Sequence, residues 1–153
     1  MSMHIDGKKI TAMYWGGLKI REAWYEEQRV FSGKPVEVMP PTPNWYDAQD
    51  WLRGRLTEYG ESYQTVKEIP FEIDTGESSN LDSMFRGCSS LTTVPDMDTS
   101  QVTDVQSMFR GCSSLTDGNV RLIGKRTGVN TVRMIQDSGL TREPFYDSSG
   151  QPI

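Results

Sequence analysis

The sequence predicts an α/β fold in which a short solenoid of strand–turn–helix repeats, with a parallel sheet, follows a capping helix and a small antiparallel β-meander. Three observations lead to this prediction. The ten-residue segment 83–92 returns unchanged at 107–116, turn signals recur near the N-terminus, and a proline-rich break precedes a single helical pattern. A fixed period of about 20–50 residues is typical of repeats that bury their apolar faces by stacking.

Composition limits the classes of partner. The 153-residue chain carries a net charge of −5, which argues against nucleic acid because phosphate binding needs concentrated Lys and Arg. Protein, glycan or a second copy of the chain remain open as partners. No apolar run approaches the about 20 residues that span a bilayer, and residues 1–7 lack the apolar core of a signal peptide. We therefore expect no membrane insertion and folding in the cytoplasm.

Residues 1–37 are expected to form an N-terminal β module. Three short segments, beginning at Gly7, Gly16 and Glu26, each place a turn before β-prone residues, as in an antiparallel meander. A module this small buries little surface, so it either covers only its own core or docks elsewhere through its aromatic side chains. The docking interpretation uses Tyr14, Trp15, Trp24, Tyr25 and Phe31.

A linker and a helix come next. Residues 38–44 contain three prolines, which disfavour a helix and favour extended chain, so this segment is the expected domain boundary. Residues 45–60 are expected to form a helix that seals the first repeat, with Asn44 as its N-terminal cap and Gly60 at its end. The apolar stripe of this helix is Ala48, Trp51, Leu52, Leu56 and Tyr59.

Residues 61–153 are expected to form the solenoid, with units that start at positions 66, 91, 115 and 140. Each unit opens with residues suited to an extended strand, and strands joined by crossovers of this length must lie parallel. Asp74 and Asp98, each followed by a threonine, can cap the free amides of the turn after the strand. The strand pattern is carried by Ile69, Ile73, Val94, Met97, Val120 and Leu122.

The second part of each unit has apolar residues at steps of three and four, which predicts a helix. Gly87 and Gly111 stand where the first two of these helices would end. The third unit departs from the pattern around residues 124–128, and Phe145 and Tyr146 are expected to close the stack. The repeat core is expected to be Leu81, Phe85, Cys88, Leu91, Val94, Val102, Val105, Phe109, Cys112 and Leu115, with Val129, Val132 and Ile135 as the degenerate third-unit stripe.

The two cysteines, Cys88 and Cys112, occupy the same phase of the repeat and should stack one above the other. We expect two reduced core residues, because disulfides are rare in a reducing compartment, although a bridge is sterically conceivable. No metal ligand set or activated nucleophile is indicated, since the only histidine, His4, lies far away in the sequence. No cofactor is expected.

Several charged residues admit a binding interpretation. Asp96, Asp98 and Asp104 suggest either calcium ligands or turn caps, and capping is favoured because the glycine and terminal glutamate of an EF-hand loop are missing. Arg86 and Arg110 share a phase and should form a two-rung ladder, either solvated or in contact with an anionic glycan or protein. The candidate binding residues are Arg86, Arg110, Arg121, Lys125 and Arg126.

Two resemblances enter at this point. Segment 102–115, VTDVQSMFRGCSSL, is similar to the BspA-like (treponemal-type) leucine-rich repeat, with an apolar pair, Met-Phe, Cys and Ser-Leu in order. This resemblance covers residues 66 to about 145. The N-terminal block and the ending 140–146 resemble minor tail proteins of phages that infect actinobacteria. The second resemblance implies a virion structural protein, assembled in the bacterial host cytoplasm, with other tail proteins as partners.

The leading hypothesis is a non-enzymatic phage tail protein whose N-terminal module docks to the tail and whose repeats face the host surface. The alternative is a bacterial leucine-rich-repeat interaction module or adhesin outside a virion. An enzyme acting on cell-wall glycan has little support, because hydrolysis needs two positioned carboxylates and Asp47 and Asp50 lack a partner constellation. No catalytic residue is therefore assigned.

Overall fold

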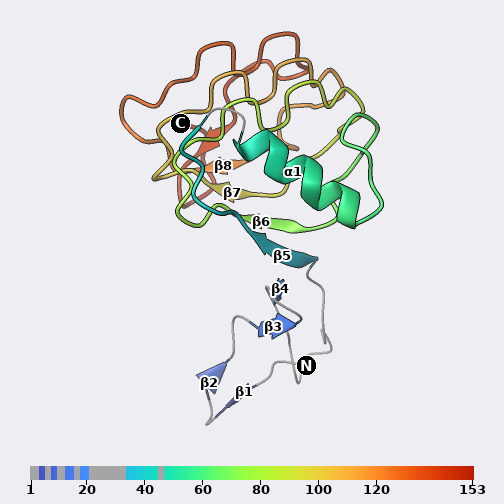
Figure 1. Cartoon of the computed structure of the whole chain (residues 1–153). Helices are drawn as coiled ribbons and strands as arrows, with labels where there is room; N and C mark the ends of the chain where they lie inside the picture. Colours follow the sequence, from blue (N-terminus) through green and yellow to red (C-terminus); the bar gives the residue numbers. More distant parts are fainter. Residues whose placement is uncertain (1–3, 6–7, 10–12, 16–17, 21–33, 45–46) are drawn as a thin grey trace.

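The chain folds as a mixed α/β structure with open, partly parallel sheets (Figure 1). The computed structural model describes residues 4–5, 8–9, 13–15, 18–20, 34–44 and 47–153. Its elements are β1 (His4–Ile5), β2 (Lys8–Lys9), β3 (Met13–Trp15), β4 (Leu18–Ile20), β5 (Pro35–Val38), α1 (Asp47–Glu58), β6 (Glu72–Asp74), β7 (Met97–Asp98), β8 (Leu122–Ile123) and β9 (Phe145–Tyr146).

The described N-terminal strands pair antiparallel, as the turn signals predicted. β1 pairs with β2, β3 with β4, and β4 with β5. β5 then pairs in parallel with β6, so that a single sheet runs in the order β3-β4-β5-β6. The N-terminal hairpin and the first repeat strand therefore belong to the same sheet.

The strands that open the later units, β7 to β9, pair in parallel, which confirms that part of the prediction, whereas β6 of the first unit pairs with β5 in another sheet. Met97 is opposite Leu122, and Leu122 is opposite Phe145. The elements β6, β7, β8 and β9 follow one another across the molecule in sequence order (Figure 1). Asp74 and Asp98 cap the following turns, because their Oδ1 atoms accept the N–H groups of Gly76 and Ser100 at 2.9 Å.

The predicted helix in the second part of each unit is wrong. These segments form consecutive turns instead, and their N–H groups point alternately in two directions. Met84 and Arg86 donate to carbonyls three residues back, whereas Ser83 and Phe85 donate to Gln106 and Met108 in the next unit, at 2.9 and 3.0 Å. We call the bonds that join successive units in this region the turn ladder. Steps of three and four also fit such turns, so the apolar spacing could not distinguish them from a helix.

Backbone conformation explains why no helix forms there. Ser83 and Ser107 have φ values of 59° and 54°, and Gly87 and Gly111 have 82° and 77°. A left-handed residue every fourth position interrupts the helical succession of backbone hydrogen bonds. The donors freed in this way bond the neighbouring unit, which makes each unit depend on the next one.

The predicted apolar phase of the third unit is only partly correct, because Val132 is out of phase. Ser107 donates to the carbonyl of Val132, so the residues inserted near 124–128 move every later side chain along the register. Met134, which is 1% exposed, is equivalent to the buried Met108, whereas Val132, which is 56% exposed, is equivalent to Gln106. Val129 and Ile135 are only partly buried against the core.

The ten predicted core residues of the two central units are all buried, and they join the helix in one cluster. Phe85 stacks on Phe109 with ring centroids 5.5 Å apart. Phe145 and Tyr146 are buried in β9, as expected of residues that close the stack. In α1, Ala48, Leu52 and Leu56 are buried, and Trp51 and Tyr59 pack partly against the core.

The structure describes the helix over Asp47–Glu58, inside the predicted range 45–60, with residues 45–46 outside the described residues. The Asp47 carboxylate accepts the N–H of Asn44 at 3.0 Å, a reciprocal form of N-terminal cap. Gly60 follows the helix with a φ of 76°, and Glu61 donates to the carbonyl of Leu56. The capping interaction places α1 directly after the proline segment.

The proline segment runs along the first unit. The Met39 N–H donates to the backbone carbonyl of Asp74 at 2.8 Å, and the Ser78 hydroxyl donates to the Pro40 carbonyl at 2.7 Å. Thr42 is 1% exposed. The segment is extended, as predicted, and hydrogen-bonded to the first unit. The division into modules 1–37, 38–44, 45–60 and 61–153 stays a prediction.

Replacing Phe109 with Ala should lower the free energy of unfolding by about 3–5 kcal/mol, because it removes a fully buried ring and the stacking of that ring on Phe85. Chemical denaturation monitored by circular dichroism measures the change. Val132→Ala, at an exposed position of the next unit, is the control and should stay within about 0.5 kcal/mol. Equal effects of the two variants would contradict the register.

Replacement by Ala should have opposite effects on stability at Gly139 and at Gly54. A Cβ on Gly139 would lie 1.9 Å from the Leu115 carbonyl oxygen, whereas a Cβ on Gly54, inside α1, meets nothing within 4 Å. Gly139→Ala should therefore destabilise the protein, and Gly54→Ala should stabilise it by up to about 1 kcal/mol through helix propensity. Thermal unfolding of both variants tests this, and a stable Gly139→Ala protein would show that the third unit is placed wrongly.

Candidate binding surface

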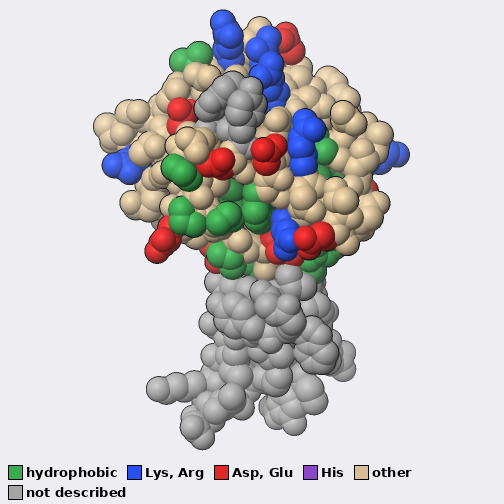
Figure 2. Space-filling model, viewed as in Figure 1, with side chains coloured by type: hydrophobic (Ala, Val, Ile, Leu, Met, Phe, Trp, Pro, Cys, Tyr) green, Lys and Arg blue, Asp and Glu red, His purple; other side chains and the backbone are tan. Residues whose placement is uncertain are grey.

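The predicted binding residues fall in two regions of the surface. Arg86 is exposed and Arg110 half-buried, at equivalent positions of the turn ladder. The backbone supports this pairing, because the N–H of Gly87 donates to the carbonyl of Arg110 at 2.8 Å. On the face shown in Figure 2, acidic and basic side chains are interspersed, and several basic ones gather at the upper edge.

The second region is the predicted basic patch, whose charges are largely engaged within the protein. Arg121 lies 3.7 Å from the Asp96 carboxylate, and Lys125 lies 2.9 Å from that of Glu143. Arg126 donates to the carbonyl of Gln101 at 3.3 Å. Partly exposed pairs of this kind contribute little stability but hold long side chains in place. Arg121 and Lys125 are thus held as one surface beside β9.

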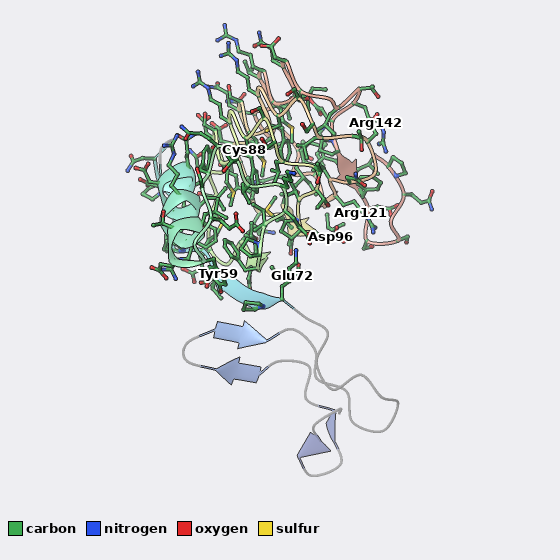
Figure 3. All side chains as sticks on the ribbon, turned by 90° about the vertical axis from the view of Figure 1, so that its right-hand side faces the viewer. Tyr59, Glu72, Cys88, Asp96, Arg121 and Arg142 are labelled. Atoms are coloured by element: carbon green, nitrogen blue, oxygen red, sulfur yellow. The ribbon has the colours of Figure 1, made fainter. Side chains whose placement is uncertain are left out.

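Tyr146 organises that surface. The guanidinium carbons of Arg121 and Arg142 lie 5.2 and 5.1 Å from its ring centroid, and Arg142 donates to its hydroxyl at 2.7 Å. Figure 3 places Arg121 beside Asp96, with Arg142 farther along the same side of the molecule. Arg142 is not among the candidate binding residues predicted from the sequence. The only sequence feature that connects Arg142 with Tyr146 is their separation of four positions. That separation brings side chains together in a helix, and Tyr146 lies in a strand.

The Lys125 ammonium also lies over an aromatic ring, 4.9 Å from the centroid of Phe145. Its partner Glu143 is partly buried, which disfavours its charged form, but hydrogen bonds from Thr131 and Lys125 outweigh burial and lower its pKa. The carboxylate therefore stays charged at neutral pH. The ion pair is a permanent feature of this surface.

A hollow of about 600 Å³ lies near the patch, on the outer side of β7 and β8. Asp98 of β7 and Asp96, just before that strand, line one side. The later segments contribute Ile123 of β8, Asp147 and Ile153. Carboxylates and apolar side chains share its walls. Such a lining suits a ligand with both polar and apolar groups better than a bare anion.

The three aspartates considered as calcium ligands act in other ways. Asp98 and Asp104 accept the backbone N–H groups of Ser100 and Gln106, at 2.9 and 2.8 Å, and Asp96 pairs with Arg121. The capping interpretation is therefore confirmed for two of them. Among the described residues, no group of three or more His, Cys, Asp or Glu side chains is arranged to hold a metal ion.

The cysteines are buried, free thiols in the core. Burial raises the pKa of Cys88 to about 11 and that of Cys112 to about 12. The Cys112 thiol donates to the carbonyl of Phe85 at 3.0 Å. A neutral thiol is a poor nucleophile, so both residues act in packing.

The other sequence-selected residues have simpler positions. Asp47 caps α1 and Asp50 is exposed in its first turn. Tyr14 and Trp15 lie in β3, opposite Lys19 and Leu18 of β4. The remaining predicted docking residues, Trp24, Tyr25 and Phe31, lie outside the described residues.

Comparison of the chain with family models, with curated proteins and with solved structures finds no match. Within the described residues, no helix combines the length and apolar character needed to cross a membrane.

Cys88 and Cys112 should not react with a thiol reagent in the native protein at pH 7.5, because both are buried and their pKa values are raised to about 11 and about 12. Both should react after denaturation without reductant. Counting modified thiols by mass spectrometry tests this. Labelling before unfolding would contradict the burial, and no labelling after it would reveal a bridge.

Proposed function

We propose that the chain is a non-enzymatic structural protein of a phage tail. Its N-terminal strands dock to the tail, and its repeats form a short leucine-rich-repeat solenoid displayed for contact with the host surface or another protein. The observation that carries this proposal is the sheet β3-β4-β5-β6, which runs from the N-terminal hairpin into the first repeat. A continuous sheet can transmit force between an anchor and a displayed region.

The solenoid part of the proposal is supported by two ladders with the same period. The opening strands β7, β8 and β9 pair in parallel, and the turn ladder joins the second part of the same units. Isolated parallel bridges from Asn80 to Asp104 and from Asp104 to Asn130 join equivalent residues of successive units in the same way. This is the arrangement in which each repeat contacts chiefly its neighbours.

The binding part of the proposal is supported by the aromatic and basic residues that meet beside β9. Arg121, Lys125 and Arg142 are held over Phe145 and Tyr146. The rings themselves are buried, so the cations held over them are the groups that a glycan or protein can contact, and little of their side-chain entropy is lost on contact. The buried thiols and the capping aspartates already serve the fold, which favours a binding role over chemistry.

Mass spectrometry of purified phage particles tests the proposal. Peptides of this chain should be present at a constant ratio to the major tail protein across a density gradient. An abundant host cytoplasmic protein, which should fall in ratio with purification, is the control for contamination. If the chain falls in the same way as the host protein, it is not a virion component and the proposal is rejected.

A further inference from the structure

Within the part of the chain that the structure describes, one edge of the turn ladder has donors without acceptors. In the first two units, every second N–H of the turn segment bonds the next unit, at 2.8–3.0 Å. Between these donors, the other N–H groups bond three residues back within their own unit. The donors to the next unit are those of Leu81, Ser83, Phe85 and Gly87, followed by those of Val105, Ser107, Phe109 and Gly111.

In the third unit, the equivalent row of donors faces outward. The bonds from Ser107 to Val132 and from Gly111 to Gln136 fix which residues of the third unit correspond to those of the second. The N–H groups that correspond to the inter-unit donors therefore belong to four residues at every second position. No described residue accepts a hydrogen bond from any of these four N–H groups. We call this row the open donor edge, and its members are Thr131, Arg133, Ile135 and Asp137.

The open donor edge keeps the backbone shape of the inner units. Arg133 and Asp137 both have a φ of 57°, at the positions equivalent to Ser107 and Gly111. A left-handed conformation is unfavourable by about 1 kcal/mol or more for a residue with a Cβ. The edge is therefore already in the conformation that binds a further unit, with no acceptor present among the described residues.

The opposite end of the ladder is closed. There the exposed groups would be carbonyls, but side chains from the preceding segments donate to them. The Thr42 hydroxyl donates to the Asn80 carbonyl at 2.6 Å. The Tyr63 hydroxyl lies 3.0 Å from the carbonyl oxygens of both Met84 and Arg86. This makes head-to-tail stacking of two copies unfavourable.

The chemistry of the edge selects its occupant. Two copies cannot pair edge to edge, because donors would face donors. The edge is also not purely cationic, since Arg133 alternates with the 56%-exposed Val132, the half-buried Ile135 and the acidic Asp137. A polyanion would leave the apolar side chains uncovered and would face the carboxylate.

We propose that the open donor edge binds a polypeptide segment of a partner protein, whose backbone carbonyls, two residues apart, accept from Thr131, Arg133, Ile135 and Asp137. Addition of a chain to an unpaired edge draws its affinity from main-chain hydrogen bonds and its selectivity from alternate side chains. Here Val132 and Ile135 supply the apolar contacts. The site is distinct from the basic surface around Tyr146 and does not depend on the location of the protein in a particle.

The test supplies the acceptor row in the same chain. The full chain is extended by a flexible Gly/Ser linker and a copy of residues 101–116, the segment whose carbonyls accept from the first unit. A linker of about 30 residues reaches about 30 Å and gives an effective concentration near the millimolar range. The matched control carries the same linker and the same residues in scrambled order.

Amide hydrogen exchange, resolved by residue, is the readout. In the unextended chain, the four edge amides should exchange fast while those of Val105, Ser107 and Phe109 are protected. The native copy should slow the edge amides by at least about tenfold, and the scrambled copy should not. Protection of the inner amides in all three proteins shows that each is folded.

Three results would overturn the proposal. Equal exchange with the native and scrambled copies would show that the edge does not take polypeptide carbonyls. Protection in the unextended chain that disappears on dilution would assign the edge to a second copy of the protein. Protection by heparin, used as a polyanionic glycan probe, without protection by the native copy would assign it to a glycan.

Discussion

The structure depends on the backbone hydrogen bonds that join residues about 24 positions apart. In the turn ladder, alternate N–H groups leave their own unit, so a single unit cannot satisfy its backbone. Parallel strands do the same on the other side of the repeat, from β7 to β9. The buried side chains then stack in register, as Phe85 does on Phe109. The core thus follows from the ladder spacing, and a phase error in the ladder displaces every side chain after it.

The two ends of this arrangement differ chemically. Carbonyls at the N-terminal end are bonded by Thr42 and Tyr63, and α1, whose Gln49 donates to the Tyr63 hydroxyl, buries Leu52 in the core. On the strand side, the chain turns back after β9, and Ile153 donates to Phe145. The turn side of the third unit has no such closure among the described residues. The repeat region therefore has a direction, with one sealed end and one donor-rich edge.

The surface beside β9 shows why single charged residues are hard to interpret from a sequence. Arg121 and Lys125 looked like free cations, but each is paired with a carboxylate and lies over an aromatic ring. Arg142 joins them only because β9 lies beside β8, which brings Tyr146 close to Arg121. Pairing with carboxylates reduces the local net charge, and the rings of Phe145 and Tyr146 are buried beneath the cations.

The sequence alone determined the repeat period, the parallel order of the opening strands, the stripe of α1 and the buried set from Leu81 to Leu115. Each of these follows from local spacing or from identical residues at a fixed offset. The tertiary structure decided between helix and turn in the second part of each unit, because steps of three and four serve both and only the neighbouring unit supplies the acceptors. It also decided which residues of the third unit face the core. The residues inserted there shift the register, and only the hydrogen bonds between units show by how much.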